Sequence, residues 1–321
     1  MKKIAVLTSG GDAPGMNTCV RAVARTAAYN KVKVVGIRDG YEGLLEGRMQ
    51  PLDARDVGGI LQRGGTVLGT ARSEEFYTEA GQQQGFKQLK KAGIQGLVVI
   101  GGDGSLRGAR ALAALGVSVV GVPASIDNDI WGTNMSIGVD TALNTIRSAI
   151  DKLRDTASSH RRAFLIETMG RNCGYLAVMA GVIGGAEVVL IPERELTIPE
   201  VADAVEKAYK RGKTHSIIIV AEGASVSTQD LAAALDKLNV GFSTRVTILG
   251  HVQRGGRPSA FDRLLATRMG VKAVEALLAG QSDVMVALQG REVEYLPLET
   301  VVNKQREANL EYFEMGRMLA F

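Results

Sequence analysis

Short apolar runs recur along the chain, and helix-like segments separate them. Runs of strand length occupy residues 3–9, 32–37, 96–102, 117–123, 163–168, 188–192, 216–223 and 245–250. Most are continuous rather than alternating, which is typical of strands buried on both faces of a parallel sheet. Amphipathic stretches predict helices at residues 15–30, 105–116, 140–159 and 303–321. The alternation predicts a doubly wound α/β fold, with a second domain beginning near Thr141.

Polar, glycine-rich segments follow six of the predicted strands. They are TSGGDAPGMN, GGDGSLRG, ASIDNDIWGTN, ETMGRNCG, AEGAS and GHVQRGGRPSAFDR. The carboxyl ends of parallel strands meet at one edge of a sheet, and ligands bind at that edge. The six segments are therefore expected to converge on one or two clefts.

Composition narrows the class of protein. At 321 residues the chain is long enough for two domains or one large one. The 38 basic and 34 acidic residues give a net charge of +4, without a block of like charges, which indicates a solvated surface. No basic stripe interleaved with aromatic residues favours nucleic acid, and scattered arginines suit phosphorylated small molecules better.

Cysteine usage and hydropathy point to a cytoplasmic protein. Cys19 and Cys173 make no disulfide framework, which fits a reducing compartment. No apolar run reaches the ~18–20 residues of a membrane helix, so no membrane is expected as a partner. The N-terminal MKKIAVLTSGG imitates a signal peptide, but Gly10, Gly11 and Asp12 interrupt its apolar run.

Two glycine-rich turns have the form of phosphate sites. SGGDAPGMN leads into a helix and lets backbone N–H groups approach an anion, although an ordinary βα turn has the same form. Met16 and Asn17 stand where a P-loop has Lys-Ser/Thr, so it is not that motif. GGDGS adds Asp103, which either holds Mg²⁺ beside phosphate or caps the following helix with Ser105.

The segment SIDND places two carboxylates after an apolar strand. A helix cap is a weak explanation, because no helical pattern follows until Thr141. A metal site and a general base that deprotonates an acceptor hydroxyl both remain open for Asp127 and Asp129. Arginines in glycine-rich segments could stabilise a transferred phosphate. These arginines are Arg72, Arg161, Arg162, Arg171, Arg245 and Arg254.

Taken in order, these motifs resemble the bacterial ATP-dependent 6-phosphofructokinase family. The resemblance runs from IAVLTSGGDAPGMN through LGTAR, GLVVIGGDGS, SIDNDIWGTN, MGRNCGYLA and HSIIIVAEG to GHVQRGG. It implies two Rossmann-like three-layer α/β/α domains with mainly parallel sheets. Residues 1–138 with 251–302 would bind ATP, and residues 139–250 with 303–321 would bind fructose 6-phosphate. The implied reaction transfers the γ-phosphoryl of MgATP to the 1-hydroxyl of that sugar.

The resemblance also implies roles for individual residues. Asp127 would be the base, supported by Ser125 and Asp129, with Gly11, Arg72 and Arg171 at the transferred phosphoryl. ATP would be held by Gly11, Tyr41, Arg72, Ser73, Gly102, Asp103, Gly104 and Ser105, with Asp103 on the Mg²⁺ side. The sugar phosphate would be held by Ser125, Ile126, Asp127, Arg162, Met169, Gly170, Arg171, Glu222, Arg245, His251 and Arg254.

Family members are homotetramers that share active sites between subunits and bind ADP or phosphoenolpyruvate as effectors. The matching effector residues here are Arg21, Arg25, Arg154, Gly185, Glu187, Arg211, Lys213 and His215. Arg21 and Arg25 are four residues apart on one predicted helix face, as in a phosphate clamp or a solvated basic face. Arg211 and Gly59 depart from the common family residues.

Two positions bear on the choice of phosphoryl donor, and at one of them Ala124 replaces the glycine that is usual in the family. Pyrophosphate-dependent relatives typically have Asp in place of Gly104 and Lys in place of Ala124, so this chain favours ATP. A pyrophosphate-dependent phosphotransferase is therefore one alternative. The other is a non-catalytic regulator that binds a nucleotide or sugar phosphate, a class expected to lose Asp127, Asp103 or Arg72. Trp131, where proline is common, has no explanation from the sequence.

Overall fold

The computed structural model describes residues 1–320, and in it the chain divides into two compact units. Unit 1 comprises Met1–Ile126, Ile130–Thr141 and Arg254–Gln305. Unit 2 comprises Asp127–Asp129, Ala142–Gln253 and the described residues from Arg306 onward. The expected assignment of ATP to one domain and of the sugar to the other stays a prediction.

The sheet of unit 1 has seven strands among the described residues, in the order β11-β10-β5-β4-β1-β2-β3. The strands are β1 (Lys3–Ser9), β2 (Lys33–Ile37), β3 (Met49–Pro51), β4 (Gly96–Gly101), β5 (Val119–Pro123), β10 (Val284–Gln289) and β11 (Glu292–Pro297). The pairs from β10 to β2 are parallel, and only the edge strands β3 and β11 pair antiparallel. From β1 the chain continues to β2 on one side and later returns to β4 on the other side of β1. This reversal of strand order creates a topological switch point.

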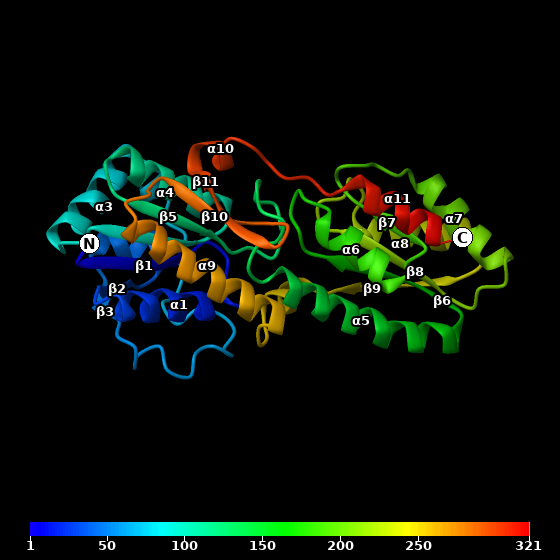
Figure 1. Ribbon diagram of the computed structural model, residues 1–321. Coiled ribbons are helices and arrows are strands. Elements are labelled where there is room, and N and C mark those ends of the chain that lie inside the picture. The colour runs from blue at the N-terminus through cyan, green and yellow to red at the C-terminus, as the bar shows by residue number, and fades with distance from the viewer. Residues whose placement is uncertain (321) are drawn as a thin grey trace. The chain divides into compact units, whose positions relative to one another are not determined.

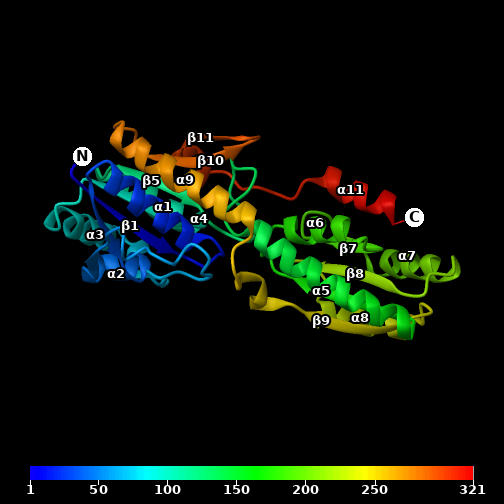
Figure 2. The same cartoon turned by 60° about the horizontal axis from the view of Figure 1, so that its bottom comes forward.

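Helices cover both faces of this sheet. Figures 1 and 2 show α1 (Met16–Tyr29) and α9 (Ala260–Leu278) side by side. The other helices are α2 (Gly40–Glu46), η1 (Glu75–Tyr77), α3 (Glu79–Lys91), α4 (Asp103–Ala114) and α10 (Leu298–Val302). Side chains of α2, η1, α3, α4 and α10 share one buried cluster with Ala5, Leu7 and Leu97 of the strands.

The sheet of unit 2 has four parallel strands among the described residues, in the order β7-β8-β6-β9. They are β6 (Arg162–Thr168), β7 (Val188–Leu190), β8 (Ser216–Ala221) and β9 (Ser243–Ile248). The helices are α5 (Val139–His160), α6 (Tyr175–Gly184), α7 (Ile198–Lys210), α8 (Thr228–Leu238) and α11 (Leu310–Leu319), with η2 (Gly250–Arg254). Leu165 and Ile218 pack against α7 and α8 on one face. Because side chains alternate along a strand, the buried Phe164 and Ile217 face the other helical layer.

The fold class predicted from the sequence is confirmed: two α/β units with mainly parallel sheets. The predicted strands agree with the observed ones to within a few residues at each end. None of the helices in the described part of the chain is long and apolar enough to cross a membrane.

One sequence expectation about an element is wrong. Residues 303–320 do not form one helix, because α11 begins only at Leu310, where the side chain of Asn309 accepts a hydrogen bond from the Glu311 N–H at 2.8 Å. Phe321, the last residue of the expected helix, lies outside the described residues. The strand expected at residues 245–250 is present as β9, but it is partly exposed. β9 is the edge strand of its sheet, and Val246 and Ile248 are 37% and 50% exposed.

Candidate active site

Three loops leave the sheet of unit 1 next to one another. Ser9 at the end of β1 pairs with Gly101 at the end of β4, and Gly101 pairs with Pro123 at the end of β5. The segments SGGDAPGMN, GGDGS and PASI therefore begin side by side at the switch point of the sheet. Ligands of open α/β sheets bind at such points, so the predicted convergence holds for these three segments.

The first loop brings a glycine against an arginine. A Cβ atom on Gly11 would lie 2.9 Å from Nη1 of Arg254, so only glycine lets the guanidinium approach this backbone. The helix α1 that follows has Gly15 at its N-cap and no side-chain cap. Its first backbone N–H groups and the Arg254 cation together make this end of the sheet favourable for an anion.

A neighbouring loop carries Arg72 and Ser73 and is fastened to the end of β1. The Thr8 hydroxyl lies 2.7 Å from the Thr66 hydroxyl and donates to the Gly69 carbonyl at 2.8 Å. The Thr70 hydroxyl donates to the Gly10 carbonyl at 2.6 Å. Arg72 is exposed on this loop. The threonines were not predicted as site residues, and only Thr70 lies within the LGTAR segment.

The second loop shows that the capping explanation for Asp103 and Ser105 is wrong. Helix α4 begins at Asp103 itself, and its N-cap is Gly102, without a side-chain hydrogen bond. The Asp103 carboxylate instead pairs with Nε of Arg107 one turn later, at 2.9 Å, and remains about one third exposed. The Asp103 carboxylate is therefore accessible to solvent at the start of α4. The same helix start can bind an anion, such as a phosphate that carries a cation.

Tyr41 lies beneath this helix start rather than on the surface. Its hydroxyl donates to the Ser105 carbonyl at 2.6 Å, and its ring stacks on Phe76 at a centroid distance of 4.0 Å. Tyr41 is 5% exposed, and burial raises the pKa of its phenol well above the usual value. In this structure Tyr41 supports the first turn of α4 through its hydroxyl.

The third loop carries Ser125 and Ile126. The packing of Trp131, which follows in the chain, gives that residue a structural role. Ser125 Cβ would lie 3.7 Å from a Cβ placed on Gly102, so the second and third loops touch. Ala124 is buried and donates its N–H to the Gly101 carbonyl at 2.9 Å. Trp131 packs against the core of unit 1, and Nζ of Lys304 lies 4.3 Å from its ring centroid.

Unit 2 contains the paired charges of the candidate site. Nε of Arg171 lies 3.3 Å from Oδ2 of Asp127. The Asp127 side chain is 5% exposed, whereas that of Arg171 is 55% exposed. Asn128 and Arg171 both have a positive φ, 53° and 51°. Positive φ is uncommon outside glycine and clusters at functional sites, so the strain marks both loops.

Hydrogen bonds to its backbone hold the loop that carries Met169, Gly170 and Arg171. Oε1 of Glu222 accepts the N–H groups of Gly170 and Arg171 at 3.1 and 2.7 Å. Oε1 of the buried Gln253 accepts the Met169 N–H at 3.3 Å. Glu222 thus shapes the loop itself. Gln253 was not predicted, although it lies in the GHVQRGG motif.

The arginines expected at the sugar phosphate belong to different units. Arg162 begins β6, and Arg245 lies on β9, the strand that pairs with β6. Arg245 is exposed, as is His251 in η2, while Arg254 belongs to unit 1. The structure places Arg162 and Arg245 on adjacent strands of unit 2.

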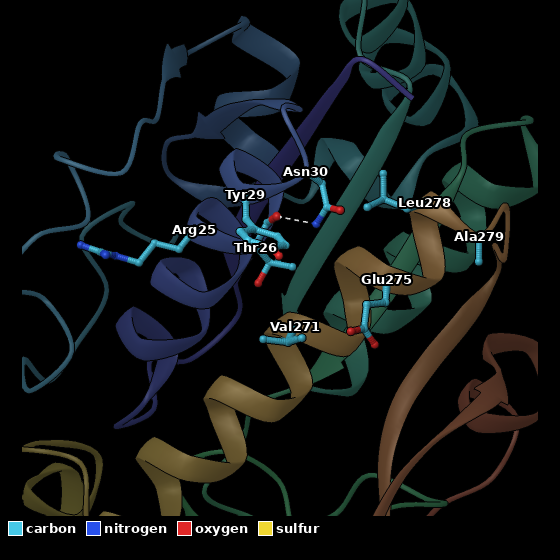
Figure 3. A pocket seen from close by; sticks show the side chains of 8 residues that line it. All are labelled: Arg25, Thr26, Tyr29, Asn30, Val271, Glu275, Leu278 and Ala279. Carbon is cyan, nitrogen blue, oxygen red and sulfur yellow. Dashed lines mark hydrogen bonds between the residues drawn. The ribbon is translucent and has the colours of Figure 1, made fainter.

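The expected effector residues also divide between the units. In unit 1, Arg25 on α1 lines a hollow of about 740 Å³ between α1 and α9, shown in Figure 3. The other residues that line it are Thr26, Tyr29, Asn30, Val271, Glu275, Leu278 and Ala279. The partly exposed Arg21 precedes Arg25 by one helical turn.

A basic cluster gathers the remaining effector residues in unit 2. Lys213 Nζ lies 3.0 Å from Glu187 and 3.1 Å from the Ala320 carbonyl, which Arg211 also contacts at 3.4 Å. Arg154 donates to the Gly184 and Gly185 carbonyls. Burial lowers the pKa of His215; Glu187 opposes this shift, and the cations of Arg154 and Lys213 add to it.

The side chains present limit how a metal could be held. Among residues 1–320, no three His, Cys, Asp or Glu side chains gather as a ligand set. Mg²⁺ needs only one or two carboxylates when phosphate oxygens and waters complete its shell. The outward-facing carboxylate of Asp103 fits that requirement.

Comparison with known proteins agrees with the motifs. The profile of the family described as Phosphofructokinase matches residues 3–277. An ATP-dependent 6-phosphofructokinase of Thermotoga neapolitana is 54% identical over 321 residues, which cover 100% of both chains. The solved phosphofructokinase from Saccharomyces cerevisiae has a TM-score of 0.88 at 41% identity, covering 94% of this chain and 45% of that one. A pyrophosphate-dependent phosphofructokinase from Marinobacter aquaeolei has a TM-score of 0.87 at 22% identity, covering 97% and 86%, and shares the fold. The resemblance found in the sequence is confirmed: the chain belongs to the phosphofructokinase family.

Proposed function

We propose that the protein is an ATP-dependent 6-phosphofructokinase of glycolysis. It transfers the γ-phosphoryl of MgATP to the 1-hydroxyl of D-fructose 6-phosphate and forms fructose 1,6-bisphosphate and ADP. The observation that carries the proposal is the pair of Asp127 and Arg171, 3.3 Å apart, in a chain whose full-length relative is named for this activity. A buried carboxylate beside an exposed guanidinium supplies a base and a cation for phosphoryl transfer.

Unit 1 supplies the nucleotide residues in this proposal. Gly11, Gly102, Gly104 and Ser105 offer backbone and hydroxyl groups at the starts of α1 and α4. Arg72 and Ser73 reach the phosphates from their loop, and Tyr41 supports the α4 start from below. Two helix N-termini at one sheet edge suit a triphosphate, because both present partial positive charge.

Asp103 is the residue proposed to hold Mg²⁺ together with phosphate oxygens. When bound, the ion neutralises charge on the phosphates and orients them. Only one carboxylate is needed for this arrangement. The contact with Arg107 keeps the Asp103 side chain on the outer face of the helix start.

Asp127 takes the proton from O1 of the sugar as O1 attacks the γ-phosphorus. The O1–P bond forms while the bond from phosphorus to the ADP oxygen breaks, and the proton moves to Asp127. Arg171 and Arg72 neutralise the charge on the transferred group, and Gly11, Ser125 and Asp129 support the reacting groups. Most of the rate enhancement comes from positioning and charge stabilisation.

Fructose 6-phosphate is held by the residues that the family resemblance assigns to the sugar and to its phosphate. Ile126, Met169, Gly170, Glu222 and His251 position the sugar, and Arg254 binds its 6-phosphate. Arg162 and Arg245 complete that site from a neighbouring subunit of a homotetramer. The exposed Val246 and Ile248 on edge strand β9 support such an assembly, because apolar edge strands are usually covered.

A regulatory site for ADP or phosphoenolpyruvate is proposed between subunits of the tetramer, with contributions from the two basic groups. Arg21 and Arg25 contribute from α1, and Arg154, Gly185, Arg211, Lys213 and His215 contribute from unit 2. Glu187 orders this second group, since its carboxylate accepts from Lys213 at 3.0 Å and from the Ile217 N–H at 2.6 Å. Clustered cations around one carboxylate suit a phosphorylated effector.

The donor experiment separates this function from its alternatives. The purified protein is given Mg²⁺ and fructose 6-phosphate, with ATP or pyrophosphate in parallel, and fructose 1,6-bisphosphate is measured. We expect product with ATP alone, because Gly104 leaves room for the nucleotide and Ala124 offers no lysine to pyrophosphate. Product mainly with pyrophosphate would overturn the donor assignment. No product with either donor would favour a non-catalytic regulator.

A further inference from the structure

The non-helical segment before α11 makes hydrogen bonds to two other parts of unit 2. We call residues 306–308 the tail segment. The Arg306 N–H donates to the Asp129 carbonyl at 3.2 Å. The Ala308 N–H donates to Oε1 of Glu193 at 2.8 Å. If residues 303–321 formed one helix, these two N–H groups would donate to carbonyl groups of that helix. Because α11 begins only after Asn309, they donate to Asp129 and Glu193 instead.

One contact of the tail segment supports the loop that carries Asp127. Besides its backbone bond to Asp129, Arg306 places its guanidinium carbon 5.2 Å from the ring centroid of Tyr175. The side chain of Tyr175 is in turn hydrogen-bonded to that of Asn128. Asn128 is fully buried at a positive φ and adjoins Asp127 in the chain. Arg306 and Tyr175 therefore support the strained residue next to the proposed base.

The other contact supports the loop that carries Arg171. Oε1 and Oε2 of Glu193 lie 2.9 and 3.1 Å from the Gly174 N–H, and Oε1 also takes the Ala308 N–H. A Cβ on Gly174 would lie 2.6 Å from this carboxylate, so the close approach requires glycine. Gly174 ends the loop that contains Arg171, and the Cys173 N–H closes that loop on the Gly170 carbonyl at 2.9 Å.

The tail segment thus connects the loops of both members of the Asp127–Arg171 pair. We propose that it sets the distance between these two side chains, and that Arg306, Tyr175 and Glu193 are positioning residues for phosphoryl transfer. The proposal rests on the proposed function, in which Asp127 and Arg171 act on the reacting groups. Losing the Glu193 carboxylate removes the shared acceptor of the Gly174 and Ala308 N–H groups, and both segments lose this anchor. A displacement of about 1 Å at a catalytic pair can cost on the order of 10²-fold in rate.

The test compares variants that remove one contact at a time. Glu193→Ala removes the carboxylate, while Glu193→Gln keeps one carbonyl oxygen at the same reach. Tyr175→Phe keeps the ring beneath Arg306 and removes only the hydroxyl. The matched controls are Glu206→Ala and Tyr209→Phe on α7, where Glu206 pairs with Lys210 and Tyr209 packs on Phe242. For each, kcat, both KM values and the melting temperature are measured with ATP and fructose 6-phosphate.

The expected pattern differs from that of a purely structural contact. Glu193→Ala and Tyr175→Phe should lower kcat by about 10- to 100-fold with the KM for ATP nearly unchanged, and Glu193→Gln should recover most of the loss. The controls should match the wild type. If Glu193→Ala does not fold, Glu193→Gln and Tyr175→Phe carry the comparison. Wild-type kcat in the folded variants, even with a lowered melting temperature, would overturn the proposal, whereas an inactive wild type would instead overturn the proposed function.

Discussion

Gly104 offers a substitution whose effects on the fold and on the nucleotide can be separated. It is the second residue of α4 and is exposed, and a Cβ placed on it would meet only the Tyr77 hydroxyl, at 3.6 Å. That is an ordinary contact, so Gly104→Asp should fold without a backbone shift. A carboxylate in the first turn of a helix adds about 0.3–1 kcal/mol of stability. The melting temperature should therefore stay the same or rise slightly.

The same substitution should weaken the binding of ATP. If the phosphates lie at the starts of α1 and α4, the new carboxylate stands about 5 Å from a phosphate charge. At an effective dielectric constant of about 20, the repulsion is about 3 kcal/mol, or on the order of 10²-fold in affinity. The assay follows fructose 1,6-bisphosphate formation across an ATP titration. Gly104→Asn, of equal size without charge, and Gly104→Ala are the matched controls.

The three variants distinguish charge from size. The KM for ATP should rise steeply for Asp, modestly for Asn and little for Ala. Equal losses for Asp and Asn would show that crowding rather than charge acts at this position. An unchanged KM in the Asp variant would refute the placement of the phosphates at the α4 start.

Three further predictions concern titration, thiols and the effector. Burial raises the pKa of Asp262 from 3.8 to about 6, because the folded protein favours the protonated side chain. The stability contributed by Asp262 is therefore fully present below pH 3.8 and is lost as the pH rises through about 6. The unfolding free energy of the wild type, measured with urea, should fall relative to Asp262→Asn by about 2 kcal/mol between pH 4 and 7, and a flat difference would contradict this. Burial also raises the pKa of Cys173, to about 12, and that of Cys19, so a thiol reagent should label the native protein at least ~10²-fold more slowly than the unfolded chain. Lys213→Met should weaken ADP or phosphoenolpyruvate by about tenfold in an effector titration without changing the unliganded KM for fructose 6-phosphate, and equal effector affinity would remove Lys213 from that site.

The strand pattern was predictable because buried parallel strands leave continuous apolar runs. β1, β4 and β8 are fully or almost fully buried along their length, and their ends were located closely from the sequence. β9, with the sequence STRVTI, is more polar than these strands and lies at an edge, and position in a sheet is a tertiary property that a local run does not encode. Residues 303–309 have a helical pattern that yields to the hydrogen bonds of the tail segment and to the cap at Asn309.

The candidate site was predictable where chemistry is concentrated in motifs. Asp127 and Arg171 were named from the sequence, and the structure pairs them within unit 2. The residues that hold their loops were not found, because Gln253 and Glu193 act through bonds to backbone N–H groups. Those bonds depend on distant segments meeting, and no local pattern marks them.

The most direct test of the proposed mechanism is turnover of Asp127→Ser beside the wild type, with saturating MgATP and fructose 6-phosphate. Calorimetric binding of fructose 6-phosphate to both proteins shows whether the sugar site is intact. We expect turnover to fall by about 10²–10⁴-fold, because a positioned base is lost, while sugar affinity is largely retained. Unchanged turnover in the folded variant would contradict the assignment of Asp127 as the base.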